Sequence, residues 1–161
     1  MLSLIILASF ALAGSKADLD SKYGFRDLKF GSAATSDSVL VEDDGAFKCY
    51  HRLSDALSIG DAALSELTYC YYNNELDTVI VKTDGISNSQ AFLAVLNAAY
   101  GDGYQSNKYI EKYYWWGELV TLSYDRNSIT DDSVVIMTSK SISKKQSDDK
   151  KATAEKAAEG L

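Results

Sequence analysis

Proline is absent from this 161-residue chain, and histidine occurs once, at position 51. Average usage of about 5 % would supply about eight prolines. Turns must therefore come from Gly, Asn, Asp and Ser, and refolding should show no slow prolyl phase. A single histidine leaves one candidate for a His-centred general base and cannot build the usual zinc site. Cys49 precedes His51 by two residues, but such residues on a strand lie about 7 Å apart, too far for a thiol–imidazole pair. We therefore interpret His51 as a half-buried or surface side chain.

Cysteine is also scarce, with only Cys49 and Cys70 in the chain. An even count in an oxidising compartment favours a disulfide, and closing a loop of roughly 20 residues would stabilise the fold by about 3 kcal/mol. The alternative is two buried free thiols, because this spacing carries no specific signature. The chain has no CxxC motif, no zinc-ligand spacing and no Asn-x-Ser/Thr glycosylation acceptor.

Positive charge is in deficit, since 16 Lys and Arg stand against 23 Asp and Glu and give a formal net charge of −7. An acidic domain repels nucleic-acid phosphates and anionic membrane surfaces, so we expect neither as a partner. The acidic clusters 42–44 and 131–132 lack the spacing of a calcium-binding loop and are interpreted as solvated turns. The glycines of 101–103 follow a predicted helix, which is not the context of a phosphate-binding loop. We therefore expect no cofactor and no metal.

Charged residues are absent from Met1 to Ala13, an almost wholly apolar run that ends in Ala11-Leu12-Ala13. This pattern predicts a secretory signal peptide with a small-x-small cleavage site, although the usual Lys or Arg is missing from its start. The run is shorter than the about 20 apolar residues that a bilayer-spanning helix needs, and position 15 is Ser rather than the cysteine of a lipid anchor. We therefore expect a periplasmic or secreted protein with no stable membrane anchor. The alternative is a buried N-terminal core segment.

About 148 residues follow the predicted cleavage site, which is one domain of ordinary size. Residues 14–22 are polar and predict a loose leader. Residues 23–142 predict a single α+β domain, with a mainly antiparallel sheet packed by one central helix. Residues 143–161 are rich in Lys and Ala and predict a charged C-terminal helix with little to bury.

Short apolar runs between turn residues predict the strands. The clearest hairpin turns at Asn73-Asn74, because Asn tolerates the positive φ of a two-residue type I′ turn. The cross-strand pairs that follow are Tyr71–Leu76, Tyr69–Thr78 and Leu67–Ile80. The predicted strands span 23–31, 39–41, 46–53, 64–72, 76–82, 109–116, 119–124 and 133–142. Helical spacing of apolar residues predicts a helix over 88–100, capped by Asn88 or Ser89 and ended by Gly101.

The run Tyr113-Tyr114-Trp115-Trp116 carries more aromatic surface than one strand face can bury, because alternate side chains point to opposite faces. A hairpin through Gly117-Glu118 places Tyr113 and Trp115 with the core. Tyr114, Trp116 and Leu119 then lie on the other face. There the leader or the C-terminal helix covers them, or they form a binding patch for a protein, a peptide or a glycan. These three residues are the candidate binding residues.

Several short motifs together resemble a loose group of small exported bacterial proteins. They are the Phe25–Gly31 segment (aromatic-Arg-x-Leu-Lys-aromatic-Gly), Ile59-Gly60, the Tyr-rich strand 69–72 with the turn Asn73–Leu76, Tyr100-Gly101, Trp116-Gly117 and the Lys- and Ala-rich end 150–161. The resemblance implies export and a similar fold, and it transfers no activity and no site.

Composition and patterning favour a non-enzymatic binding or accessory protein that acts on a protein or an envelope component. Two other functions stay open. A small carboxylate-dependent hydrolase would need two carboxyl groups roughly 5 to 9.5 Å apart in a cleft. A small-ligand carrier would need an apolar cavity of roughly 300 Å³, for which Tyr69, Tyr71 and Phe92 are the expected lining.

Overall fold

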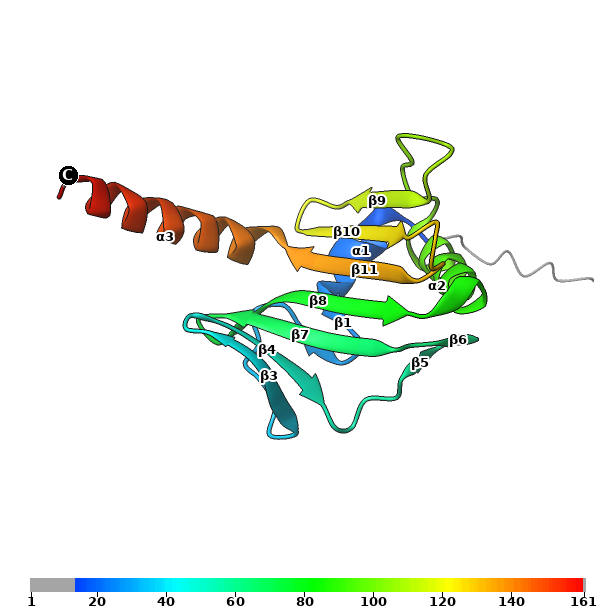
Figure 1. Ribbon diagram of the computed structural model, residues 1–161, viewed down its shortest axis with the longest axis horizontal. Coiled ribbons are helices and arrows are strands. Elements are labelled where there is room, and N and C mark those ends of the chain that lie inside the picture. The colour runs from blue at the N-terminus through cyan, green and yellow to red at the C-terminus, as the bar shows by residue number, and fades with distance from the viewer. Residues whose placement is uncertain (1–13, 161) are drawn as a thin grey trace, which may run out of the picture.

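A computed structural model describes residues 14–160, which form a seven-stranded antiparallel sheet, two small two-stranded sheets and three helices (Figure 1). The strand order of the large sheet is β3-β4-β7-β8-β11-β10-β9. The predicted signal peptide, residues 1–13, lies outside the described residues. The helices are α1 (Lys16–Lys22), α2 (Gly85–Tyr100) and α3 (Lys140–Ala158). The strands are β1 (Gly24–Phe25), β2 (Leu28–Lys29), β3 (Ser38–Asp44), β4 (Phe47–Arg52), β5 (Ser58–Ile59), β6 (Ala62–Ala63), β7 (Glu66–Tyr72), β8 (Glu75–Thr83), β9 (Lys112–Trp116), β10 (Val120–Arg126) and β11 (Ser133–Ser139).

One face of the large sheet is covered by α1, α2 and the small hairpins, and the core lies beneath this layer. Figure 1 shows α1 behind β10 and β11. The arrangement confirms the predicted α+β class, with α2 as the central helix and α3 at the C-terminal end. The covering layer buries Leu19, Phe25, Phe92 and Leu96 against Leu67, Tyr69, Val79, Val81, Trp115, Leu122, Tyr124, Val135 and Met137 of the sheet.

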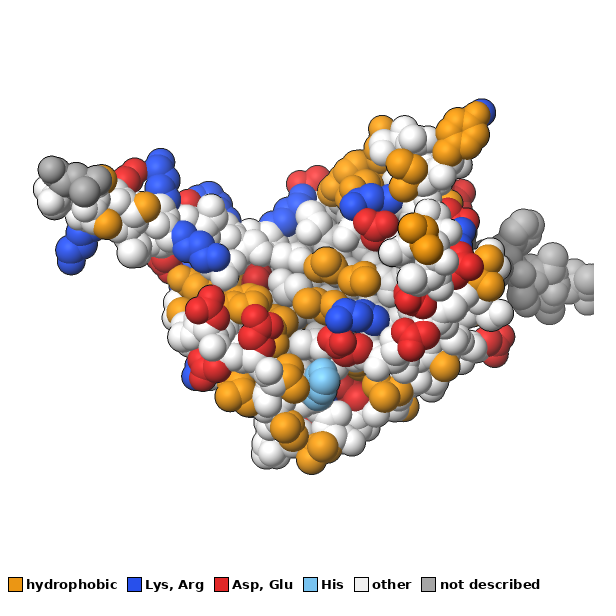
Figure 2. All heavy atoms as spheres, in the orientation of Figure 1, with side chains coloured by type: hydrophobic (Ala, Val, Ile, Leu, Met, Phe, Trp, Pro, Cys, Tyr) orange, Lys and Arg blue, Asp and Glu red, His pale blue; other side chains and the backbone are white. Residues whose placement is uncertain are grey.

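The opposite side, called the open face below, faces the viewer in Figure 2, where apolar side chains are interspersed with separate charged groups. Its residues alternate with the buried ones along each strand. The open face consists of Glu66, Thr68, Thr78, Ile80, Lys82, Tyr114, Trp116, Thr121, Ser123, Asp125, Val134, Ile136 and Thr138, together with the side of β4 that bears Cys49 and His51.

The β7–β8 hairpin turns at Asn73 and Asn74, whose φ values of 49° and 65° confirm the predicted turn. The predicted pair Tyr71–Leu76 is also correct. A bulge between Cys70 and Tyr71 leaves Asp77 without a partner in the register. Beyond the bulge the other two predicted pairs are wrong, because the strands are shifted by one residue. The observed pairs are Tyr69–Val79 and Leu67–Val81, and Thr78 and Ile80 lie on the open face.

The β9–β10 hairpin keeps the predicted faces although its register differs. The backbone N–H of Gly117 donates to the carbonyl of Val120 over 2.9 Å, so the two-residue loop is Glu118-Leu119 rather than Gly117-Glu118. Trp116 pairs with Thr121. The register differs from the prediction by two residues, and a shift of two leaves every side chain on its predicted face.

Helix α2 begins one turn earlier than predicted, at Gly85, with Asp84 as its N-cap residue. The prediction of Asn88 or Ser89 as the cap is wrong. Asn88 instead donates its side-chain amide to the carbonyl of Asp84 over 3.0 Å, and Ser89 is buried with its hydroxyl donated to the carbonyl of Asp131. Gly101 ends the helix with a φ of 75°, as predicted.

The segment expected as a loose leader folds onto the body of the protein. Residues 16–22 form α1, and its Leu19 is fully buried in the core. The polar composition concealed this role, because one apolar side chain at the right point of a short helix is enough to dock it. Asp20, on the same helix, accepts hydrogen bonds from the β9–β10 turn.

Helix α3 begins at Lys140, so the last strand ends at Ser139 and not at Ile142 as predicted. Ile142 is its only buried residue. Figure 1 shows the rest of the helix projecting away from the sheet. The low apolar content of this segment predicted a helix with little to bury, and left open whether it packs on the sheet.

Candidate binding site

Three aromatic side chains form a cluster at the edge strand β9, called the aromatic cluster below. The Tyr114 and Trp116 rings are parallel within 7°, with their centroids 5.4 Å apart. The Tyr104 ring lies 5.3 Å from the ring of Trp116. Trp116 is 49 % exposed and Tyr104 is 53 % exposed, whereas Tyr114 is half-buried between neighbours. Neither α1 nor α3 hides these rings, so the cluster is open to solvent.

The aromatic cluster is fixed from both sides of the strand. Tyr104 pairs with Tyr114 through two backbone hydrogen bonds of 2.8 and 3.0 Å, which hold its loop along the edge of β9. Beneath, the indole N–H of Trp115 donates to the carbonyl of Gly101 over 2.7 Å. A Cβ atom on Gly103 would lie 2.7 Å from the Trp115 ring, so only glycine allows this loop to pack so closely.

Leu119 is the third predicted binding residue, and it lies in the turn next to Trp116. It is 52 % exposed. The Asp20 carboxylate accepts hydrogen bonds from the backbone N–H groups of Glu118, Leu119 and Val120 at 2.5, 2.9 and 3.0 Å. Partial burial raises the pKa of Asp20, but these three amides outweigh it and leave the pKa below its usual value. The structure therefore brings Trp116 and Leu119 together on a turn that α1 holds in place.

Hydroxyl groups extend from the aromatic cluster across the open face. Trp116 pairs with Thr121, Thr121 with Thr138, and Thr138 with Thr78 along one row of cross-strand partners. On the same face, the charged side chains lie two rows away, beyond the row of Tyr114, Ser123, Ile136 and Ile80, and they are already paired. Lys112 contacts Asp125 at 2.6 Å, and Lys82 contacts Glu66 at 2.8 Å. The open face beside the cluster thus carries hydroxyl and apolar side chains, and these two lysines are each paired with a carboxylate.

The sequence analysis proposed Tyr114, Trp116 and Leu119 as binding residues and did not include Tyr104 and Asp20, which the structure places beside them. Tyr104 reaches the cluster through a loop whose path the residue pattern does not reveal. Asp20 reaches the turn from almost 100 residues earlier in the chain. One feature of the sequence pointed to the Tyr104 loop, namely Gly101-Asp102-Gly103, because its two glycines indicate that the backbone closely approaches another part of the protein.

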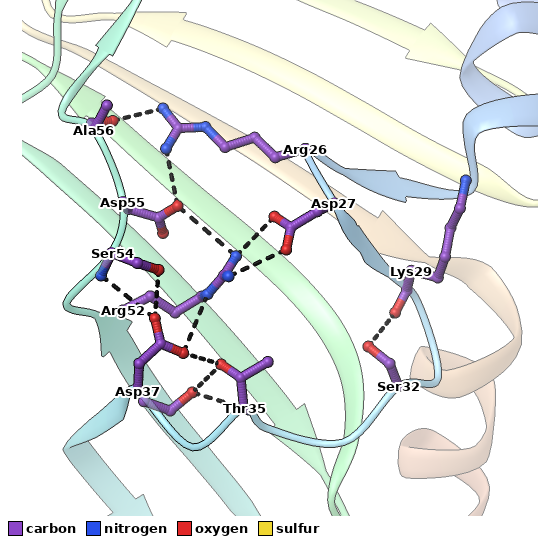
Figure 3. Close-up of polar contacts among 11 residues, drawn as sticks. Arg26, Asp27, Lys29, Ser32, Thr35, Asp37, Arg52, Ser54, Asp55 and Ala56 are labelled. Atoms are coloured by element: carbon purple, nitrogen blue, oxygen red, sulfur yellow. Dashed lines mark hydrogen bonds and ion pairs between the residues drawn. The ribbon is translucent and has the colours of Figure 1, made fainter.

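A polar cluster lies on the covered side of the sheet, around Arg26 and Arg52 (Figure 3). Arg52 forms a bidentate ion pair with Asp27 at 2.9 and 3.1 Å, and Arg26 contacts Asp55 at 2.9 Å. Asp37 accepts hydrogen bonds from the hydroxyls of Ser54 and Thr35, which lower its pKa to about 2. These contacts fasten the β1–β2 hairpin to β4 and to the segment after it. We assign the cluster a structural role, which also explains the Arg-Asp pair of the Phe25–Gly31 motif.

A cleft of about 660 Å³ lies between α3, the β3–β4 hairpin and the start of β8. Glu42, Asp44, Asp77 and Asp149 contribute carboxylates to its lining. Asp77 is buried, which raises the pKa of its carboxyl, and it accepts hydrogen bonds from Ser143 at 2.9 Å and Thr78 at 3.1 Å. One oxygen of Asp77 holds the first turn of α3 through Ser143, and the other accepts from its neighbour Thr78 in β8, so we assign Asp77 a structural role. The hydrolase stays a hypothesis.

The remaining sequence candidates have structural partners. Cys49 and Cys70 form the predicted disulfide between β4 and β7, so the free-thiol alternative is wrong. His51 is exposed and shares a hydrogen bond with Thr68 over 3.1 Å. In the acidic clusters, Asp43 pairs with Lys48, and Asp132 accepts the backbone N–H of Gly85. Within residues 14–160 there is no group of three or more potential ligands able to hold a metal ion, and no helix long and apolar enough to cross a membrane.

Comparison of the chain with protein families, curated proteins and solved structures gives no match. The resemblance to small exported bacterial proteins therefore stays a prediction, and the candidate site stands on its geometry.

Proposed function

We propose that this chain is an exported, non-catalytic binding domain that captures a partner protein through the aromatic cluster and Leu119. The observation that carries the proposal is the exposure of Trp116, on β9, side by side with Tyr104, on the loop that is hydrogen-bonded to β9. Trp and Tyr are enriched among the few residues that carry most of the binding energy at protein interfaces. Fixed rings also lose little conformational freedom on binding.

Export is supported by the disulfide and by the N-terminal sequence. The Cys49–Cys70 bond is of a kind that persists in oxidising compartments and is rare in the cytosol. The uncharged apolar run before residue 14 fits a signal peptide. Both features favour the periplasm or the extracellular space as the place of action.

The expected partner carries a basic surface. The chain has a net charge of −7, and Asp102 and Glu118 are exposed beside Tyr104 and Trp116 in the sequence. Lys112 is the nearby cation on β9, and Asp125 neutralises it. Complementary charge speeds encounter and selects among partners, whereas the aromatic rings hold the complex together.

The test is affinity capture from native envelope and secreted fractions, with the protein from residue 14 onward as bait. The variant Trp116→Ala/Leu119→Ala should lose a stoichiometric partner that the unchanged protein retains. The matched control is Leu53→Ala/Ile129→Ala, which removes two exposed apolar side chains elsewhere. Equal loss with the control, or full capture by the cluster variant, would contradict the proposal.

A further inference from the structure

An apolar cavity of about 290 Å³ lies inside the covered side of the protein, apart from the aromatic cluster. Its floor is the sheet, through Val79, Val81, Val135 and Met137, which are all 3 % exposed or less. Native interiors rarely leave voids much larger than a water molecule. A cavity of this size between well-packed apolar side chains is therefore unusual and indicates room for a ligand.

Two elements of the covering layer complete the cavity. Helix α2 contributes Phe92, Val95 and Leu96 to one wall, and the small hairpins contribute Phe25 and Ile59. The expected pocket residue Phe92 is therefore correctly placed. The prediction that Tyr69 and Tyr71 line the pocket is wrong, because both are packed in the core and do not line this cavity.

The charged groups of the cavity are basic, although the chain is acidic overall. Lys22, at the end of α1, and Arg26 are part of the lining, and within the described residues no carboxylate is. Arg26 is already engaged by Asp55 and by the carbonyls of Ala56 and Ser58. Lys22 is exposed and forms no ion pair within residues 14–160.

We propose that this cavity binds a small amphipathic molecule, with an aliphatic part on the valine floor and one anionic group paired with Lys22. The apolar walls exclude a strongly polar ligand, because burying unpaired polar groups is costly. The volume is about twice that of the roughly 150 Å³ apolar cavity that accommodates benzene. A medium-length alkyl chain with a terminal carboxylate meets both conditions. This site is independent of the proposed partner-binding surface.

Isothermal titration calorimetry with three probes of equal chain length tests the proposal. Decanoate, decanol and decyltrimethylammonium share the alkyl chain and differ in the charge of the head group. The two ionic probes are titrated below their micelle concentrations, and decanol below its solubility limit, into the protein from residue 14 onward. Decanoate should bind with one-to-one stoichiometry, decanol about threefold to fivefold more weakly, and the cation more weakly still, since an exposed ion pair accounts for at most about a fivefold difference. Absence of decanoate binding, or equal binding of all three probes, would overturn the proposal.

Two pairs of variants locate the binding in the cavity. Val95→Trp fills the cavity from a half-buried position of α2, and Ile86→Trp places the same ring on an exposed position of that helix outside the cavity. The first should weaken decanoate binding at least about tenfold and the second should not. Lys22→Ala should remove the preference for decanoate over decanol, whereas Lys16→Ala, on the same helix, should keep it.

Near-ultraviolet circular dichroism verifies that the filled variant keeps its native packing. If Val95→Trp fails this check, Leu96→Phe fills the same cavity with a smaller change of shape. Unchanged decanoate binding in a correctly folded filled variant would place the ligand elsewhere and overturn the assignment. Loss of the head-group preference in Lys16→Ala as well as Lys22→Ala would overturn the role of Lys22.

Discussion

Trp115 and Trp116 are neighbours in the chain and lie on opposite faces of one strand, with different consequences. Trp115 is fully buried, and its N–H donates to the carbonyl of Gly101. Trp116 is half exposed and stacks on Tyr114. The aromatic residue of the covered face thus packs in the core, whereas that of the open face stays half exposed, and we propose that it contacts a partner. The difference arises from strand alternation and from the layer of helices on one side only.

The largest expected effect comes from exchanging the two tryptophans separately for alanine. Trp115→Ala should lower the free energy of unfolding by about 3 to 5 kcal/mol, because it leaves a cavity in the core. Trp116→Ala should cost about 1 kcal/mol, chiefly the stacking on Tyr114, and should abolish partner capture. Urea unfolding measures both stabilities. Equal destabilisation by the two substitutions would contradict the assignment of Trp116 to a binding surface.

The second prediction concerns the disulfide, which joins two strands on the open face. The bond spans 21 residues of chain, so its removal should lower the free energy of unfolding by about 3 kcal/mol. Cys49→Ala/Cys70→Ala should unfold at a lower urea concentration than the oxidised protein, and reductant should not change it further. Capture should persist in folded protein, since the bond lies four strands from β9 in the sheet. Loss of capture in the folded variant would show that the two regions are coupled.

The third prediction concerns Asp20, which connects α1 of the covering layer to the β9–β10 turn. Asp20→Asn should cost about 1 to 2 kcal/mol of stability, because it weakens three charge-assisted hydrogen bonds to backbone amides. The same variant should loosen the turn that carries Leu119 and weaken capture. The control is Asp18→Asn on the same helix, which affects only the cap formed with Ser15. Urea unfolding and capture are measured for both variants.

The pH dependence of stability follows from the same carboxylate. Because the folded pKa of Asp20 lies below the usual value for an aspartate, its contribution is fully present above that usual value. The contribution is lost as the pH falls through the lower, folded pKa. Asp20→Asn should therefore reduce the loss of stability as the pH is lowered below the usual pKa of an aspartate. Parallel acid-unfolding curves for the variant and the unchanged protein would contradict the assignment.

Much of the fold could be predicted from the sequence, because local patterns determine it. Asn73-Asn74 predicted a turn because Asn tolerates positive φ values. The alternation of side chains along the strand predicted that Tyr113 and Trp115 face the core. In the β9–β10 hairpin the predicted register is wrong by two residues, but each side chain still lies on its predicted face. In the β7–β8 hairpin the predicted pairs beyond Tyr71–Leu76 are wrong, because the bulge at Asp77 shifts the register by one residue. No property of the residues at that point signals a bulge.

The parts of the candidate site that escaped prediction depend on contacts distant in sequence. Asp20 lies in a segment whose composition indicates a leader, yet it binds a turn almost 100 residues away. Tyr104 joins the cluster through a loop that must first be placed beside β9. Lys22 and the valine floor of the cavity come together only once α1 has docked on the sheet. Composition and periodicity report on neighbours along the chain, and these contacts are not between neighbours.

The smallest expected effect on stability comes from Lys112, which borders the aromatic cluster. Its pair with Asp125 is largely exposed, so Lys112→Ala should change the free energy of unfolding by less than about 0.5 kcal/mol. The substitution removes a cation beside Tyr114 and frees the carboxylate of Asp125. A basic partner should therefore bind faster at low salt, and the gain should fade as salt screens the charges. Lys151→Ala, on the distant part of α3, changes the net charge equally and should give a smaller gain. Slower association for Lys112→Ala would mean that the partner presents negative charge to this edge of the sheet.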